Sequence, residues 1–185
     1  NWDSTMTRKN KLAAFGLALL LAGCATPPAE DENASYTTTL NPQHWRAEGK
    51  IAMRYPECHR SRGCEDKGVN ANMAWTHHNQ DELLVITDPF GQERMRIDYR
   101  GGVINVREGA REEVMSKEEL AKEVGLPVPL ESIANWLITQ RSDESFNADG
   151  WQVDVRDWQG AYYHSIRLKQ KDYQMKLVVQ KMTTI

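Results

Sequence analysis

Three cysteines are the side chains of this sequence best suited to covalent or metal chemistry: Cys24, Cys58 and Cys64. Cys58 and Cys64 have five residues between them and lie in a polar segment, residues 56–68. If the chain is exported, two thiols so close together in an oxidising compartment can form a disulfide. We therefore expect a Cys58–Cys64 disulfide that closes a loop over residues 56–68.

A metal site is the alternative for the same loop. Its nitrogen and sulfur ligands would come from Cys58, His59, Cys64, His77 and His78. Zinc sites usually place about two to four residues between paired cysteines, and many carry a second such pair. The spacing here is longer and no second pair follows. The pattern therefore favours the disulfide and predicts no bound metal.

Catalytic motifs are the next class of pattern to consider. The sequence contains no GxSxG, HExxH, phosphate-binding loop or dinucleotide fingerprint. A thiol hydrolase built on Cys58 and His164 is the remaining alternative, but Cys58 lies in a polar segment beside a potential disulfide partner. We expect no enzymatic activity and no dissociable cofactor.

The first 23 residues are typical of an export signal. A basic stretch with Arg8, Lys9 and Lys11 precedes an uncharged run of ten residues, 12–21. That run is about half of the roughly 20 residues that a membrane-spanning helix needs. The pattern predicts a cleaved signal peptide and not a permanent membrane span.

Cys24 ends the tetrapeptide Leu21-Ala22-Gly23-Cys24, which resembles the lipobox of bacterial lipoproteins. The resemblance implies cleavage between Gly23 and Cys24, a diacylglycerol on the Cys24 sulfur and an acyl group on the new amine. Two or more acyl chains anchor a protein stably to a membrane. The alternative is a soluble secreted protein with an ordinary cleavage site, since small residues suit both.

Residue 25 indicates whether the lipid anchor lies in the inner or the outer membrane. It is Ala, whereas an Asp at this position usually keeps proteobacterial lipoproteins in the inner membrane. We therefore expect the protein to be anchored at the periplasmic face of the outer membrane.

Composition divides the chain after the signal into two parts. Residues 24–41 are rich in Pro, Ala, Thr and Ser, which predicts a flexible lipidated tether, and residues 42–185 are long enough for one domain with a core. Without the signal the chain has 20 basic and 25 acidic residues, with both signs interspersed. No basic patch indicates nucleic-acid binding, and no pattern predicts self-association, so we expect a monomer.

Alternation of apolar and polar residues dominates the domain and predicts β-strands with one apolar face. The alternating segments centre on residues 51–55, 71–75, 95–99, 104–106, 151–155, 163–168 and 175–179. Short turns between these segments indicate an antiparallel meander.

Two helices are expected to interrupt the strands. Ser116 with Glu119 three residues later is a capping box, and Gly125 is expected to end that helix. A second helix is predicted after Pro129, with an apolar stripe that includes Trp136 and Leu137. The predicted fold is mainly β: one curved antiparallel sheet, a half-closed β-barrel, with a small helical lid across its concave face.

An apolar strand, residues 83–86, runs into the turn Asp88-Pro89-Phe90-Gly91. Pro is suited to the second position of such a turn and Gly to its exit, which places Phe90 at the apex. Phe90 could be exposed there or could fold back onto the edge of the sheet, and the sequence leaves both open.

Several of these segments, taken in order, resemble the LolB family of outer-membrane lipoproteins, which receive other lipoproteins from the periplasmic carrier LolA. The similarity covers about residues 40–185 and includes Trp45, Gly49, Trp75, the 88–91 turn and the Pro-x-Pro-Leu segment that leads into residues 135–137. It implies a half-closed barrel with a helical lid over an apolar cavity. It also implies that the chain accepts lipoproteins from LolA, holds their acyl chains and inserts them into the inner leaflet of the outer membrane.

The resemblance also implies roles for individual residues. Family members usually carry Asn-Pro-Leu-Gly at the turn, and the protruding Leu helps to pass cargo into the membrane. Phe90 takes the place of that Leu, and Asp88 replaces the Asn. The Cys58 to Cys64 segment is a second departure from the family pattern.

The expected cavity lining consists of apolar residues on the inward faces of the strands and on the second helix. They are Met53, Met73, Trp75, Leu84, Ile86, Met95, Ile97, Trp136 and Leu137. Any of them could instead belong to an ordinary filled core. The alternative function is accordingly a lipid-anchored structural or assembly module of the cell envelope with such a core.

Overall fold

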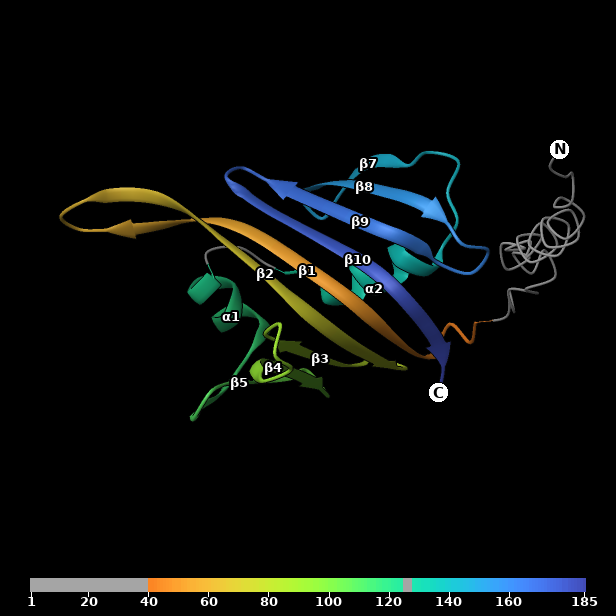
Figure 1. Ribbon diagram of the computed structural model, residues 1–185, viewed down its shortest axis with the longest axis horizontal. Coiled ribbons are helices and arrows are strands. Elements are labelled where there is room, and N and C mark those ends of the chain that lie inside the picture. The colour runs from red at the N-terminus through yellow and green to blue at the C-terminus, as the bar shows by residue number, and fades with distance from the viewer. Residues whose placement is uncertain (1–39, 125–127) are drawn as a thin grey trace, which may run out of the picture. The chain divides into compact units, whose positions relative to one another are not determined.

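The computed structural model describes residues 40–124 and 128–185, which contain ten β-strands and two α-helices (Figure 1). The signal segment with Gly23, the lipidation site Cys24 and the tether up to residue 39 lie outside the described residues, as do Gly125 and Pro127. In the described ranges neither helix is long and apolar enough to cross a membrane. The strands are β1 (His44–His59), β2 (Gly63–His78), β3 (Asp81–Thr87), β4 (Glu93–Arg100), β5 (Val103–Glu108), β6 (Arg111–Met115), β7 (Ser145–Ala148), β8 (Trp151–Trp158), β9 (Tyr163–Gln170) and β10 (Tyr173–Thr184), and the helices are α1 (Lys117–Val124) and α2 (Leu130–Ile138).

All ten strands form one antiparallel sheet in the order β6-β5-β4-β3-β2-β1-β10-β9-β8-β7. Every neighbouring pair is consecutive in sequence except β1 and β10, the first and last strands, which meet in the middle. The edge strands β6 and β7 are not paired with each other, so the curved sheet stays open (Figure 1). This confirms the mainly β, antiparallel fold predicted from the sequence.

Gly49 marks an irregularity where β1 meets β10. The register shifts between Glu48 and Gly49, as in a β-bulge. A Cβ atom at Gly49 would lie 1.9 Å from the backbone oxygen of Val178. Only glycine allows the strands to approach this closely, and bulges increase local twist and bend the strand.

Alternation along each strand explains which face of the sheet is buried. In β8, Trp151, Val153 and Val155 are buried whereas Gln152 and Arg156 are exposed. The buried residues of β1, β8, β9 and β10 join those of α2 in one core cluster. α2 lies behind β1 and β10 in Figure 1 and packs against β9.

The two helices begin where the sequence predicted. The Glu119 amide donates to Ser116 Oγ at 3.1 Å and the Ser116 amide donates to Glu119 Oε2 at 2.8 Å, which is the expected capping box. An ion pair between Lys117 of α1 and Glu131 of α2, at 3.1 Å, links the helices.

Two short strands were not predicted. β6 has the sequence Arg-Glu-Glu-Val-Met, and β7 has only four residues, Ser-Phe-Asn-Ala. Neither segment carries an alternating apolar pattern long enough to identify a strand. Pairing with β5 and β8, which the sequence did identify, decides their conformation.

The predicted loop over residues 56–68 was wrong. These residues continue β1 and β2 as a regular hairpin, and beyond Arg54 and Asn72 the two strands pair only with each other. Residues 55–71, here called the arm, project past the other strands (Figure 1). Cys58 and Cys64 lie directly opposite each other near the tip and are joined by a disulfide.

Removing the disulfide by Cys58→Ser with Cys64→Ser should loosen the arm and leave the rest of the fold intact. A two-stranded ribbon is only marginally stable by itself, so the covalent link contributes mainly to local order. We expect the melting temperature in calorimetry to change by less than about 2 °C, and amide exchange within residues 55–71 to accelerate by at least about tenfold. A fall of more than about 5 °C would mean that the arm unfolds together with the core.

Candidate functional site

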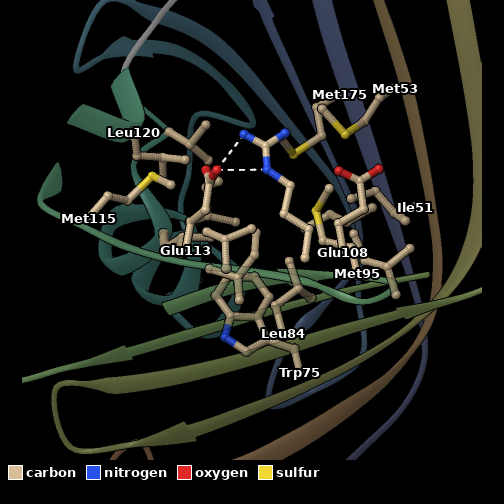
Figure 2. Close-up of a pocket in the computed structure, with 18 residues that line it drawn as sticks. Ile51, Met53, Trp75, Leu84, Met95, Glu108, Glu113, Met115, Leu120 and Met175 are labelled. Atoms are coloured by element: carbon tan, nitrogen blue, oxygen red, sulfur yellow. Dashed lines mark hydrogen bonds and ion pairs between the residues drawn. The ribbon is translucent and has the colours of Figure 1, made fainter. Parts of the chain in front are cut away.

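An apolar cavity of about 250 Å³ lies between one half of the sheet and the two helices. Fifteen of the eighteen residues around it are apolar, and Figure 2 shows them converging on one space. The lining consists of Ile51, Met53, Trp75, Leu84, Ile86, Met95, Ile97, Val106, Glu108, Arg111, Glu113, Met115, Leu120, Val128, Leu130, Ile133, Met175 and Leu177. β1 to β6 and β10 supply the strand residues, which places the cavity on the half of the sheet opposite β7 to β9.

Six of the nine residues expected to line the cavity do so. They are Met53, Trp75, Leu84, Ile86, Met95 and Ile97. Each lies on the same face of β1 to β4, because cross-strand partners such as Ile86 and Met95, or Leu84 and Ile97, share a face.

Met73, Trp136 and Leu137 were wrongly assigned to the cavity. Met73 packs in the core cluster and does not border the cavity; it lies opposite Gly49, which has no side chain. Leu137 is fully buried, and the Trp136 ring packs edge-on against Phe146 at 5.7 Å between ring centroids. Alternation identified the inward face correctly, but it could not tell which inward residues are covered by other side chains.

α2 explains this division of the inward face. Its first turns place Leu130 and Ile133 on the cavity, whereas Trp136 and Leu137 in its last turn fill the core. One helix of nine residues is too short to cover the inward face of ten strands. The part over β1 to β6 and the adjoining stretch of β10 is left as a cavity.

Methionines form a large share of the cavity wall. Met53 and Met175 are cross-strand partners and lie side by side in Figure 2, and Met95 and Met115 contribute from β4 and β6. Unbranched thioether side chains adapt to ligands of variable shape. The wall is therefore suited to flexible hydrocarbon ligands.

Trp75 is held in the wall by a buried hydrogen-bond network that the sequence pattern does not predict. Its Nε1 donates to Glu82 Oε2 at 2.6 Å, and the other oxygen of Glu82 lies 2.8 Å from His77 Nδ1. Glu82 is 1% exposed. The network satisfies the polar edge of the indole, so the ring can present apolar surface to the cavity.

The cavity is not entirely apolar. Glu108, Arg111 and Glu113 belong to its lining, and Arg111 Nε donates to Glu113 Oε1 at 2.7 Å. The sequence pattern does not indicate them, because the segment Arg111–Met115 lacks the alternation that identifies a strand and its inward positions.

The 88–91 turn presents Phe90 to solvent. Phe90 is 90% exposed and therefore does not fold back onto the sheet. The Gly91 amide donates to the carbonyl oxygen of Asp88 at 3.0 Å, and Gly91 has a φ of 82°. Pro89 and Phe90 are the central residues of this turn, so Phe90 is at the apex, as predicted.

Asp88 fixes the geometry of this turn. Its Oδ1 accepts hydrogen bonds from the amides of Phe90 at 2.9 Å and Gln92 at 3.0 Å, and its Oδ2 lies 2.8 Å from Arg94. Burial alone would raise the pKa of Asp88, but the bonds from Gln92 and Phe90 and the charge of Arg94 lower the pKa below its ordinary value of 3.8. The carboxylate thus stays charged while only 9% exposed.

The disulfide removes the Cys58 thiol that both alternatives, a thiol hydrolase and a metal site, would require. A sulfur in a disulfide is neither a thiolate nucleophile nor a thiolate ligand, so the hydrolase pair with His164 and the cysteine metal site both lose their sulfur. Within the described residues, no group of three or more His, Cys, Asp or Glu side chains is arranged to hold a metal ion.

Comparison with known proteins agrees with this geometry. A family model described as "Outer membrane lipoprotein LolB" matches residues 43–181, three quarters of the chain. The chain belongs to the LolB family. The match spans β1 through most of β10 and therefore includes the cavity and the Phe90 turn.

Individual relatives support the assignment to the LolB family. The outer-membrane lipoprotein LolB of Halorhodospira halophila is 25% identical, and the match covers 80% of this chain and 79% of that protein. LolB of Aeromonas salmonicida is also 25% identical, with 85% and 82% covered.

A solved LolA superfamily protein from Nitrosomonas europaea has a TM-score of 0.35 and 9% identity, and covers 79% of this chain and 88% of its own.

Membership of the LolB family establishes the general role of the chain. It is an outer-membrane lipoprotein with a part in lipoprotein localisation. LolB proteins are a trafficking family and not a family of enzymes.

Two methionines of the same face allow a direct test of which residues are core and which are cavity wall. Met73→Ala should lower the free energy of unfolding by about 2–5 kcal/mol, because it removes packed atoms from the core. Met95→Ala should cost less than about 1.5 kcal/mol, because its side chain borders open space. Urea denaturation of both variants measures the difference, and equal costs would mean that the cavity is filled core.

Acid titration tests the Asp88 turn. A carboxylate whose pKa is lowered by folding stabilises the folded state above its ordinary pKa, and this contribution is lost as the pH falls through the lowered value. In NMR spectra the amide signals of Phe90 and Gln92 should therefore shift with a midpoint below 3.8. Asp88→Asn should abolish this transition, and a midpoint at or above 3.8 would contradict the assignment.

Proposed function

We propose that this chain accepts lipoproteins from the periplasmic carrier LolA and inserts them into the inner leaflet of the outer membrane. The observation that carries the proposal is an open apolar cavity at the same end of the sheet as an exposed apolar turn. Membership of the LolB family supports it, since these proteins are lipoproteins of the outer membrane.

Strand register places the cavity beside the Phe90 turn. Ile86 and Met95 are cross-strand partners on the cavity wall, and the turn joins their two strands directly beyond them. Asn72 of β2 donates from its Nδ2 to the carbonyl oxygen of Asp88 at 3.3 Å and so ties the turn to the sheet. A ligand leaving the cavity at this end would meet the surface that carries Phe90.

The energy of acyl-chain transfer explains why a cavity is needed. Releasing a chain of about 16 carbons into water would cost on the order of 10 kcal/mol, at about 0.8 kcal/mol per methylene. Passage from the LolA cavity into this one, and then into the bilayer, avoids that aqueous step. The protein therefore needs no covalent chemistry, only apolar surfaces in contact at each step.

Phe90 suits the final step because an exposed aromatic ring can enter the acyl region of a membrane. The Asp88 carboxylate, which departs from the family's usual Asn, is turned inward onto the backbone amides and Arg94. It therefore presents little charge to a membrane that Phe90 contacts.

The proposed anchor is an N-acyl and S-diacylglycerol lipid on Cys24, followed by the tether of residues 24–41. An anchored domain at the periplasmic face would keep Phe90 close to the inner leaflet. The alternative function, an assembly module, predicts an ordinary filled core. Such a module would not need the cavity.

Reconstitution with the carrier tests acceptance. LolA loaded with a radiolabelled lipoprotein is mixed with residues 24–185 carrying Cys24→Ala, so that no lipid of the acceptor itself competes. We expect label to move to this protein without release into solution. A folded protein that takes no label from LolA would contradict the acceptor function and favour the assembly module.

Phe90→Glu should separate acceptance from insertion. The variant should fold and take label from LolA, but delivery to phospholipid vesicles should fall at least about tenfold, because a charge enters the acyl region at high cost. Val103→Glu is the matched control, since Val103 is also an exposed apolar residue but lies at the opposite end of β4 and β5. Unfolding of Phe90→Glu, or equal loss in both variants, would contradict a membrane role for Phe90.

A further inference from the structure

Three charged side chains interrupt the apolar wall of the cavity at one place, the hairpin of β5 and β6. Glu108 ends β5, and Arg111 and Glu113 belong to β6. The other fifteen lining residues are apolar. A hydrocarbon chain offers no partner to a carboxylate or a guanidinium, so binding of acyl chains alone does not account for this cluster.

The strand pairing places these three residues on the face of the sheet that borders the cavity. Glu108 pairs with Arg111 and Val106 pairs with Glu113, so the charged residues share a face with Val106 of the wall. Arg107 and Glu112, the intervening pair, belong to the opposite face. The same hairpin thus carries a charged pair on each face, only one of which borders the cavity.

The cluster lies at the edge of the cavity and is within reach of a ligand. The side chain of Arg111 is 66% exposed and that of Glu113 is 37% exposed. Met95, an apolar wall residue, is the cross-strand partner of Glu108. Charged and apolar surfaces therefore adjoin along a single line of the sheet, as an amphipathic ligand requires (Figure 2).

We infer that Glu108, Arg111 and Glu113 form a subsite for the polar end of an acylated peptide. The Arg111 guanidinium would donate to ester or amide carbonyl oxygens, and the two carboxylates would accept hydrogen bonds from peptide N–H groups. The acyl chains then lie along β1 to β4 and β10, and the peptide leaves over the β5–β6 edge. This inference rests on the proposed function and specifies the ligand as a lipopeptide and not a free hydrocarbon.

Exchange of partners at this edge is feasible because the ion pair between Arg111 and Glu113 is solvent-exposed. Exposed ion pairs contribute little to stability, so a ligand can compete for their hydrogen-bonding groups. Phosphatidylcholine shares the ester carbonyls but has no N–H group to donate to the carboxylates, which therefore favour the peptide.

The test compares three ligands on residues 24–185 carrying Cys24→Ala. They are a tripalmitoylated cysteinyl peptide, dipalmitoyl phosphatidylcholine and an uncharged hydrophobic dye. Arg111→Met with Glu113→Leu replaces the charged pair by apolar side chains of similar length. We expect its dissociation constant for the lipopeptide to rise about tenfold, the loss of one charge-assisted hydrogen bond, with dye binding unchanged or tighter.

Two further variants act as controls. Arg107→Met with Glu112→Leu removes the pair on the opposite face of the same hairpin and should leave lipopeptide binding unchanged. Arg111→Glu with Glu113→Arg keeps an ion pair but exchanges the positions of donor and acceptor, and it should still weaken lipopeptide binding. If this exchanged variant binds the lipopeptide normally, the pair is structural and the subsite is refuted.

The remaining outcomes separate the subsite from the proposed function. A wild-type chain that binds neither dye nor lipopeptide would contradict both. If the wild type binds both ligands, but Arg111→Met with Glu113→Leu weakens the binding of dye and of lipopeptide equally, only the subsite is contradicted. Equal loss for phosphatidylcholine and lipopeptide would mean that the cluster does not recognise the peptide.

Discussion

Burial of the inward apolar face of a ten-stranded sheet is the constraint on which the other features of this protein depend. Alternation gives β1 to β5 and β8 to β10 an apolar side that must be shielded from water, and the helices available for this are short. α2 covers the half formed by β8 to β10 and completes a core with Trp151, Val153 and Leu168. The half formed by β1 to β6, with the adjoining stretch of β10, is shielded only in part, and its apolar surface becomes the wall of a cavity.

Keeping such a cavity open requires that the residues of its wall be held in place by their neighbours. Trp75 is the clearest case, because Glu82 and His77, which lie beside it on the same face of β2 and β3, fix its indole nitrogen. Gly49 permits the close approach of β1 and β10 at the centre of the sheet. Glu82, His77 and Gly49 bind no ligand in the proposed mechanism, yet the position of the wall depends on them.

Departures from the family pattern become intelligible in the structure. Asp88 in place of Asn leaves the turn intact, because its carboxylate binds two amides and Arg94 and presents little charge to solvent. The Cys58–Cys64 disulfide closes the arm, where β1 and β2 pair with no other strand among the described residues. In both places a local covalent or electrostatic contact replaces support that packing does not provide.

The sequence by itself determined the strand pattern, the two helices, the capping box at Ser116 and the turn with Phe90 at its apex, because alternation, capping and turn preferences are local properties. It also identified Cys58 and Cys64 as partners, although it wrongly placed them in a loop. Only the tertiary structure decided that Met73, Trp136 and Leu137 are core while Met95 and Ile97 border a cavity, because depth depends on what packs above a residue. It also brought Glu108, Arg111 and Glu113 to the cavity edge, since β6 becomes a strand only by pairing with β5.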